Sequence, residues 1–551
     1  MLTGERSYAD AGRGRPGPTE EGARNPGQEP NHKRQEASRP GWLRHSLPLR
    51  AGDIAAYVGC DTLTEGLIYL MVVFSPWAFG SSQPWAVWVM NVGAYALGAM
   101  LALKLAIRWG KGYRPARWGA GDIGRRKMED EGRATDYGTR WPMVLAVLTV
   151  AILAYCLVSA LNASATCDPA TGTFKYHPHL IWLPHSFDSS RTWFAFWSYL
   201  GLACSFWSIR DWLLGKSAAE AHPRRDTTGR GGEAERALPP ARLRRLFWVL
   251  AINGGLLGVE AIVQRLEGSG KLLFLVKPAI HKTAATQFGP YAYYANASQY
   301  FNLLWPACLG FWWMLDRSRR HLVLACAAIM AACPIISTSR GGALISVGML
   351  CLAAGFLAIA PFWFASPPQE NSRARKMTAG ALAVFFVLAL ALGFSLGWRA
   401  LRPRMAQLRE GYQNREQDYE LARPIAEDYP VFGIGPGAFE SVSQLYRPTT
   451  DVNWFEQLHN DWLETRITFG LVGSTLIALA LGTVVLRWFA PGGIQGGRRF
   501  VGLMWLGLGG CLLHARFDFP FQVHSIVFLF LVLCAVLFTL SRRPCRETLK
   551  F

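Results

Sequence analysis

Residues 141–161 read WPMVLAVLTVAILAYCLVSAL and contain no charged side chain. A helix of about 20 mainly apolar residues is long enough to cross the hydrocarbon core of a bilayer, so this stretch predicts a membrane-spanning helix. Eleven other stretches have the same character. The sequence therefore predicts an all-α polytopic membrane protein with about twelve transmembrane helices, near residues 62–80, 84–103, 141–161, 192–209, 245–263, 299–315, 321–336, 342–365, 378–397, 467–487, 499–515 and 523–540.

The overall composition agrees with this fold class. Of the 551 residues, 51% are hydrophobic and only 17% are charged, whereas soluble domains carry about 25% charged residues. The formal net charge is nevertheless +19. Such a charge has to be explained either by binding to nucleic acid or by membrane topology.

The distribution of Lys and Arg favours topology. With the N-terminus placed inside, 41 of the 57 basic residues fall on segments assigned to the inside and 16 on segments assigned to the outside. Cytoplasmic loops retain positive charge during insertion, so both termini are predicted to be cytoplasmic. Binding to nucleic acid is not needed to explain the charge.

The predicted organisation follows from these spans. It comprises a disordered basic cytoplasmic tail at 1–50, nine helices within 51–397 with basic cytoplasmic insertions at 104–140 and 210–245, an outside cap loop at 398–466, three helices within 467–540 and a cytoplasmic tail at 541–551. The cap mixes acidic, basic and aromatic residues. Long loops of this kind are usually folded and functional, so the functional site is expected on the outside face of the membrane, where the cap lies.

The first candidate site lies in EQLHNDWLETRITFG, residues 456–470. Asn460 or Asp461 can cap the helix that becomes the tenth span, which leaves His459 at a helix N-terminus where a neutral imidazole is favoured. Gly470 and Gly473 would allow a neighbouring helix to approach closely. The alternative is an ordinary interfacial histidine above a packing face of small residues.

The second candidate is Arg340 in STSRGGALIS, residues 337–346. A lone arginine in a short outside loop opposes the topological bias, and its guanidinium can hold two phosphate oxygens while nearby amides and hydroxyls line the site. The alternative is an arginine that anchors a helix end at the membrane surface.

The third candidate is the turn HARFDFPFQVHS, residues 514–525. Arg516 and Asp518 either bind substrate or simply pair with each other. Arg265 and Lys282 belong to a further basic outside segment that could contact an anionic head group. No DxD pair or Walker A loop occurs, and the sequence predicts neither a metal site nor a cofactor.

Several of these motifs together resemble the bacterial O-antigen ligase and O-antigen polymerase superfamily of membrane glycosyltransferases. The ligase pattern, a His-Asn pair followed after nine residues by Gly-x-x-Gly, is matched from His459 to Gly473, and an Arg-x-x-x-Leu element is matched by Arg340 and Leu344. The GIGPGAF stretch at 433–439 and the turn with Asp518 are also similar, so the shared features run from about 289 to 525.

One departure from the family concerns the stretch GPYAYYANASQY, which contains Asn296 but no adjacent arginine. The resemblance implies a cation here that supplies a second phosphate contact. Arg265, Lys282 and Arg447 are the candidates for that role.

The resemblance implies transfer of a glycan from undecaprenyl diphosphate to an acceptor hydroxyl, at a periplasmic site of a multi-pass protein of the bacterial inner membrane. His459 would act as general base and Arg340 would hold the developing charge, with Asn460 and the candidates above in substrate binding. The acceptor would be lipid A core or a similar lipid or glycan. The alternatives are an O-antigen or exopolysaccharide polymerase, a protein glycan ligase and, from another class, a secondary transporter.

Overall fold

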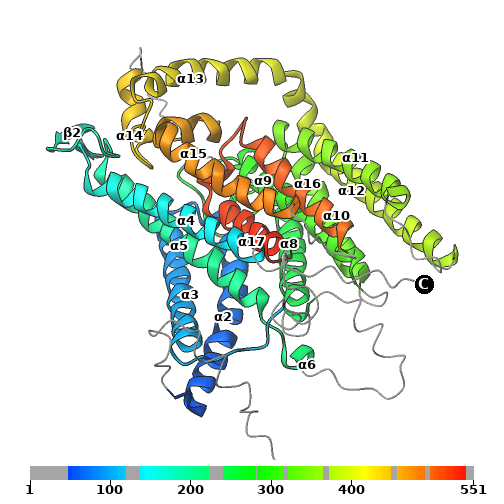
Figure 1. Cartoon of the computed structure of the whole chain (residues 1–551). Coiled ribbons are helices and arrows are strands. Elements are labelled where there is room, and N and C mark those ends of the chain that lie inside the picture. Colours follow the sequence, from blue (N-terminus) through cyan, green and yellow to red (C-terminus); the bar gives the residue numbers. More distant parts are fainter. Residues whose placement is uncertain are drawn as a thin grey trace, which may run out of the picture.

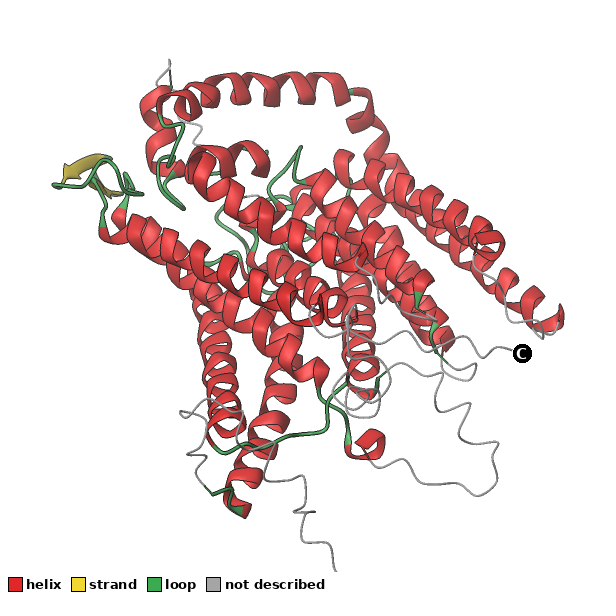
Figure 2. Cartoon of the chain, viewed as in Figure 1, coloured by secondary structure: helices red, strands yellow, loops and turns green. Residues whose placement is uncertain are grey.

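The computed structural model of the chain describes residues 48–118, 137–221, 240–280, 282–315, 320–363, 372–447, 456–489 and 497–540. Apolar stretches form the long helices of a bundle, and most of the remaining described chain forms a layer over one end of it (Figures 1 and 2). The bundle helices are α2 (Ala51–Trp77), α3 (Pro84–Gly110), α4 (Tyr137–Leu161), α5 (Ser189–Leu214), α8 (Ala241–Glu267), α9 (Tyr294–Trp313), α10 (Arg320–Ile336), α11 (Arg340–Trp363), α12 (Ser372–Ala406), α15 (Asp461–Phe489), α16 (Arg498–His514) and α17 (His524–Leu540).

Each of the twelve predicted stretches overlaps one of these helices. Within the described ranges, seven of them are long and apolar enough to cross a membrane, namely α2, α3, α4, α8, α11, α12 and α15, and α10 and α17 are shorter apolar helices. A helical polytopic membrane protein is therefore confirmed. The number of twelve spans and the side of the termini stay predictions, and the tails predicted at 1–50 and 541–551 lie outside the described residues apart from 48–50.

The two basic insertions predicted at 104–140 and 210–245 are described only in part. A four-residue helix, α6 (Ala218–Ala221), belongs to the second insertion and lies at the end of the bundle opposite the cap (Figure 1). The segments predicted to be outside, which include 162–191 and most of the cap, lie together at the other end. This separation agrees with the two sides that the charge distribution predicts.

The centre of the bundle is α9, whose residues from Ala295 to Trp312 are all buried. It packs against α10 and α16 and also contacts α8, α11 and α17. Trp305 and Phe301 contribute to a continuous apolar core, and burial of such large side chains is a main source of stability. The beginning of α9, at Tyr293 and Tyr294, is thereby fixed at the cap end of the bundle.

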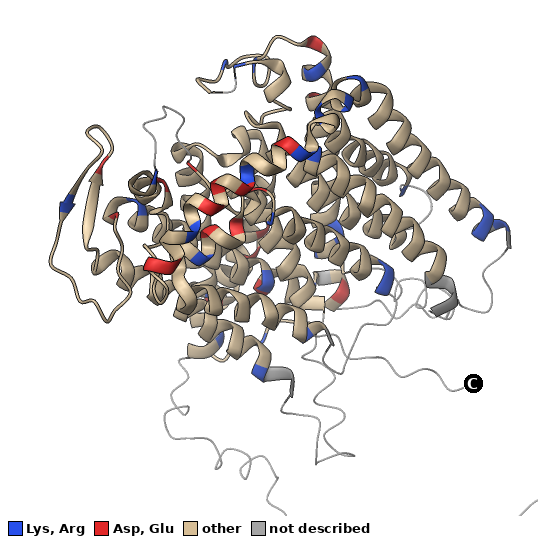
Figure 3. Cartoon of the chain, turned by 90° about the horizontal axis from the view of Figure 1, so that it is seen from above, with Lys and Arg blue, Asp and Glu red and all other residues tan. Residues whose placement is uncertain are grey.

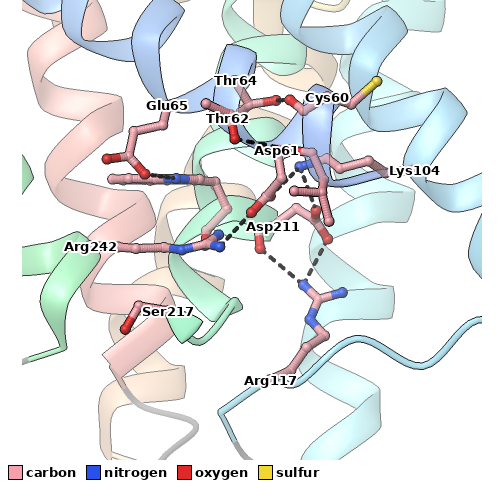
Figure 4. A network of polar contacts seen from close by, with 12 residues as sticks. Cys60, Asp61, Thr62, Thr64, Glu65, Lys104, Arg117, Asp211, Ser217 and Arg242 are labelled. Atoms are coloured by element: carbon pink, nitrogen blue, oxygen red, sulfur yellow. Dashed lines mark hydrogen bonds and ion pairs between the residues drawn. The ribbon is translucent and has the colours of Figure 1, made fainter. Parts of the chain in front are cut away.

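Charged residues also hold the helices together at the end away from the cap (Figure 4). Lys104 is fully buried, and its Nζ lies 3.2 Å from carboxylate oxygens of both Asp61 and Asp211. Arg117 pairs with Asp211 at 2.7 Å, and Arg242 pairs with Asp61. Buried charges are tolerated only when they are paired, so this network fixes α2, α3, α5 and α8 relative to one another.

One short hairpin departs from the predicted all-α class. Strands β1 (Ala165–Asp168) and β2 (Thr173–Tyr176) pair in antiparallel register in the segment between α4 and α5. The turn between them has Gly172 at φ 67° and an Asp168 carboxylate that accepts hydrogen bonds from Ala170 and Thr171. Asp and Gly favour such a turn, and the flanking Thr, Phe and Tyr residues favour strands.

The cap is built from α13 (Leu408–Asp428), α14 (Phe439–Ser443) and the 3-10 helix η4 (Gln444–Tyr446). Helix α13 is amphipathic, because its buried residues Tyr419, Ala422 and Ile425 recur at helical spacing. Helix α12 continues past the predicted boundary at 397 to Ala406. Seen from the cap side, Lys, Arg, Asp and Glu gather in the middle of the face, and the surrounding helices carry few of them (Figure 3).

Candidate functional site

The candidate site is centred on His459, which directly precedes α15. His459 adopts a left-handed conformation with φ 56°, and its carbonyl oxygen accepts a hydrogen bond from the Tyr419 hydroxyl of α13 at 2.8 Å. Asn460 is the helix cap, because its Oδ1 accepts from the Leu463 amide at 3.2 Å. A non-glycine residue keeps a positive φ only where its surroundings fix it. Here the hydrogen bond from Tyr419 and the helix cap at Asn460 fix the backbone of His459.

Asp518 is the direct partner of the His459 ring. The Nδ1 of His459 lies 2.9 Å from Oδ1 of Asp518, whose side chain is only 3% exposed. Burial by itself raises the pKa of the Asp518 carboxyl, but the hydrogen bond from His459 and the positive charge of Arg415 outweigh it, so the pKa lies below its ordinary value. The carboxylate is therefore ionised and can only accept a hydrogen bond.

This pairing determines the tautomer of the imidazole. Since Asp518 accepts, Nδ1 of His459 carries the proton, and Nε2 of the neutral ring keeps its lone pair. About a quarter of the His459 side chain is exposed. The geometry is that of a general base held by a carboxylate, in which the second group orients the ring and stabilises the imidazolium that forms.

Two aromatic rings fix the plane of the imidazole. The Phe519 ring lies 4.8 Å from the His459 ring, and the Tyr293 ring lies 6.1 Å from it. Tyr293 and Phe519 in turn stack on each other at 5.7 Å. The ring of His459 thus contacts residues from two distant segments, the start of α9 and the turn before α17.

The turn that carries Asp518 is bound to the start of α15. The Asp461 amide donates to the carbonyl oxygens of Ala515 and Asp518, at 2.9 and 3.3 Å, and the Asp461 carboxylate accepts from the Phe521 amide at 2.8 Å. The alternative that Arg516 and Asp518 pair with each other is wrong. Arg516 lies instead over the ring of Tyr419, because Asp518 points inward to His459.

A second group of residues surrounds the loop from Ser337 to Ser339. Arg265 donates to the carbonyl oxygen of Ser337 at 2.8 Å, and Arg404 of α12 donates to the carbonyl and hydroxyl oxygens of Thr338 at 3.1 and 3.0 Å. Arg340 begins α11 next to this loop and donates to the carbonyl oxygen of Gln407 at 2.8 Å. We refer to Arg265, Arg340 and Arg404 as the arginine cluster.

The arginine cluster carries positive charge that the described part of the chain does not neutralise. Its guanidinium groups donate to backbone or hydroxyl oxygens, and none of them forms an ion pair with a described carboxylate. Arg265 and Arg404 are close enough for their charges to repel each other. Such a group is suited to an anion with several oxygens, because arginine binds phosphate oxygens in a bidentate manner.

Tyr293 and Tyr294 connect the arginine cluster to the histidine. Their rings lie 5.0 Å apart, and the Arg404 guanidinium lies 4.4 Å above the Tyr294 ring, whereas Tyr293 faces His459. Arg404 of α12 thus lies beside the start of α9, the stretch that has no adjacent arginine in the sequence. Sequence reasoning missed Arg404 and also Arg415, whose Nη2 lies 3.7 Å from Oδ2 of Asp518.

The other predicted cations lie in different places. Lys282 is exposed on the loop before the 3-10 helix η3 (Ala284–Thr286), and the structure does not bring its side chain to the arginine cluster. Arg447 lies within electrostatic range of Asp418, a half-buried residue of α13. Burial raises the pKa of the Asp418 carboxyl, and the charges of His459, Arg415 and Arg447 oppose that shift.

Gly470 has a role other than the predicted one. It has φ 57° and ψ −164° and breaks α15, and a Cβ there would collide with the Val431 carbonyl oxygen. The predicted contact with a neighbouring helix is wrong, because a loop of the cap approaches here. The amides of Leu471 and Val472 donate to the carbonyl oxygens of Pro430 and Val431, at 3.0 and 3.1 Å.

Gly473 also does not face a neighbouring helix. A Cβ at this position would lie 2.8 Å from the side chain of Phe469, which belongs to the same helix. Gly473 therefore leaves room for the ring of Phe469. Both glycines serve the geometry of the break rather than helix packing.

The described residues contain no group of three or more His, Cys, Asp or Glu side chains that could hold a metal ion.

Residues 325–478 match the model of the protein family O-antigen ligase. This range includes Arg340, Arg404, Arg415 and His459, and it ends shortly after Gly473. The resemblance to the O-antigen ligase superfamily is thereby confirmed. No curated protein matches the chain. The matched range contains His459, Arg340 and Arg404, and the parts of the chain on either side of it contribute Arg265, Tyr293 and Asp518.

Proposed function

We propose that this protein transfers a preassembled glycan from undecaprenyl diphosphate to an acceptor hydroxyl on the periplasmic face of the bacterial inner membrane. The observation that carries the proposal is the 2.9 Å hydrogen bond between His459 and Asp518, beside cations without described carboxylate partners. The O-antigen ligase match and the membrane-spanning helices support the same conclusion. An O-antigen ligase acting on lipid A core or a similar acceptor is the function that fits best.

The proton of the acceptor hydroxyl goes to Nε2 of His459. As this proton leaves, the hydroxyl oxygen forms a bond to the anomeric carbon of the glycan. At the same time, the bond between that carbon and the diphosphate oxygen breaks. Asp518 keeps Nε2 unprotonated before the reaction and stabilises the imidazolium afterwards. Such base catalysis contributes about 10²- to 10⁴-fold.

The electron pair of the broken bond remains on the diphosphate, which is released as the leaving group. The arginine cluster stabilises its charge, with Arg340 joined by Arg265 and Arg404. Preorganised cations are most effective where charge develops in the transition state. Neither ATP nor a metal ion is required by this scheme, and direct displacement inverts the configuration at the anomeric carbon.

The test is a transfer assay with a labelled lipid-linked glycan and the purified chain in proteoliposomes. His459→Ala and Arg340→Ala are expected to abolish transfer, whereas Arg409→Gln, an exposed arginine of α13, leaves it unchanged. Addition of a chelator should have no effect. If either alanine variant is folded and transfers glycan at the wild-type rate, that residue has no part in the mechanism.

The acceptor distinguishes the alternatives within the superfamily. A polymerase lengthens glycans stepwise and produces a ladder on a gel, a ligase moves a finished glycan to its acceptor in one step, and a protein glycan ligase labels a protein. For a secondary transporter, labelled solute would accumulate in the vesicles without any glycan transfer.

A further inference from the structure

A cavity adjoins His459 on the side of the cap. Its volume is about 310 Å³, and it lies between α13, the start of α15 and the turn before α17. Its walls include the residue that follows His459, Asn460, and also Tyr419, which binds the His459 carbonyl oxygen. The cavity therefore lies next to the proposed general base.

The walls of this cavity are strongly basic. Arg423, Arg466 and Arg516 line it, and no acidic residue does. The described ion pairs at this end of the molecule join Arg191 to Glu440, and Arg415 and His459 to Asp518, so none of them involves the three arginines. Three like charges around one cavity repel one another, and an anionic group bound between them would remove that repulsion.

The arginines are held without being neutralised. Arg466 donates to the carbonyl oxygen of Pro430 at 2.7 Å, and Arg516 lies 5.6 Å from the centre of the Tyr419 ring. Arg423 is exposed one helical turn after Tyr419 on α13. Two of the guanidinium groups thus have defined positions, as expected for a preorganised anion site.

The cavity also presents an aromatic surface. Trp462 is 48% exposed, and its Nε1 donates to the carbonyl oxygen of Leu512 at 3.1 Å, which fixes the orientation of the ring. A flat, fixed apolar ring next to donors of hydrogen bonds matches a saccharide, whose faces carry C–H groups and whose edge carries hydroxyls.

We infer that this cavity binds an anionic saccharide, namely the phosphate- or carboxylate-bearing sugar of the acceptor that presents its hydroxyl to His459. This inference rests on the proposed function, since it names the acceptor of that site. The arginine cluster contacts α8, α12 and the loop at 337–339, whereas the cavity is formed by α13, α15 and Arg516, so the two anion sites are separate.

The binding test uses a hexose 6-phosphate, a hexuronate and the neutral hexose as probes. Saturation-transfer NMR on the full chain in nanodiscs measures their weak binding without any reaction. The phosphate and carboxylate probes are expected to bind, the stronger of the two identifies the anionic group, and the neutral hexose binds at least tenfold more weakly. Equal binding of the neutral hexose would overturn the inference.

Variants connect the binding to the cavity. Arg423→Gln combined with Arg516→Gln should weaken binding of the charged probe by about a hundredfold, taking tenfold for each charge-assisted hydrogen bond. Arg516→Lys, which keeps the charge, should retain most of the binding and shows that the turn is intact. Arg409→Gln on α13, outside the cavity, is the control. Unchanged binding in the double variant contradicts the assignment.

The same variants separate this inference from the proposed function. His459→Ala should bind the charged probe like wild type although it transfers no glycan. In the transfer assay, the double arginine variant should raise KM for a phosphorylated acceptor oligosaccharide and leave kcat unchanged, with little effect on the phosphatase-treated form. Binding without transfer in the wild type refutes the proposed function alone, and transfer without arginine-dependent binding refutes this cavity alone.

Discussion

Asp518→Asn is the most informative single substitution in the site. It removes a negative charge 2.9 Å from Nδ1 of His459 and replaces an obligate acceptor with an amide that can donate. An amide donating to Nδ1 favours the tautomer with the proton on Nε2, which cannot accept the proton of the acceptor hydroxyl. The substitution changes little in volume, so its effect reports on the protonation of His459.

The expected loss follows from the role of the carboxylate. If Asp518 provides both the tautomer and the stabilisation of the imidazolium, its removal costs most of the base catalysis, about 10²- to 10⁴-fold. This corresponds to about 3–5 kcal/mol in activation free energy. Since Asp518 contacts no reacting atom in this scheme, the loss should appear in kcat and leave KM for the donor nearly unchanged.

The assay is single-turnover transfer of a labelled lipid-linked glycan in proteoliposomes, with circular dichroism and thermal unfolding as checks of the fold. Asp168→Asn, in the hairpin turn of the same end, is the matched control. The double variant Asp518→Asn with His459→Ala should be no slower than His459→Ala alone, because Asp518 acts through the histidine. A folded Asp518→Asn protein within threefold of wild type, or losses that multiply in the double variant, would refute this reasoning.

Three other substitutions test the remaining structure. Arg404→Gln should lower kcat/KM for the donor by about ten- to a hundredfold, since a hydrogen bond to a charged group contributes about 1.5–3 kcal/mol; initial rates against donor concentration measure this, with the exposed Arg402→Gln as control. Gly470→Ala should lower the free energy of unfolding by about 1–3 kcal/mol and reduce transfer, because its backbone conformation is almost confined to glycine. Denaturant titration measures this loss, and Gly482→Ala, with open space around it in the same helix, should be stable. Asp211→Asn should cost about 3–5 kcal/mol in the same titration, because Lys104 and Arg117 lose their shared carboxylate. Wild-type stability of the Asp211 variant would show that the network in Figure 4 does not hold the helices.

The positions of the bundle helices were predictable because each depends on a local property, an apolar run of sufficient length. The same holds for the cap of α15, since Asn460 and the apolar residues after it are neighbours in sequence. The hydrogen bond between His459 and Asp518 was not predictable, although both residues were candidates for the site. They are 59 positions apart, and the sequence offered Arg516 as an equally good partner for the carboxylate.

Arg404 and Arg415 were missed for a related reason. Both belong to helical stretches in which several arginines are exposed, and only the packing of α12 and α13 over Thr338 and Asp518 distinguishes them. The error at Gly470 has a similar origin. A glycine in an apolar helix usually indicates close helix packing, whereas here backbone groups at 430–435 approach from the cap.

The break at Gly470 divides α15 into two mechanical parts. Residues 471–489 rise by about 28 Å at 1.5 Å per residue, close to the roughly 30 Å thickness of a hydrocarbon core, and the preceding turns carry Asn460 and lie with the cap. A helix that spans the bilayer tilts when the bilayer becomes thinner or thicker. Because the helix is interrupted at Gly470, we expect such a tilt to reach His459 less directly than it would through a continuous helix.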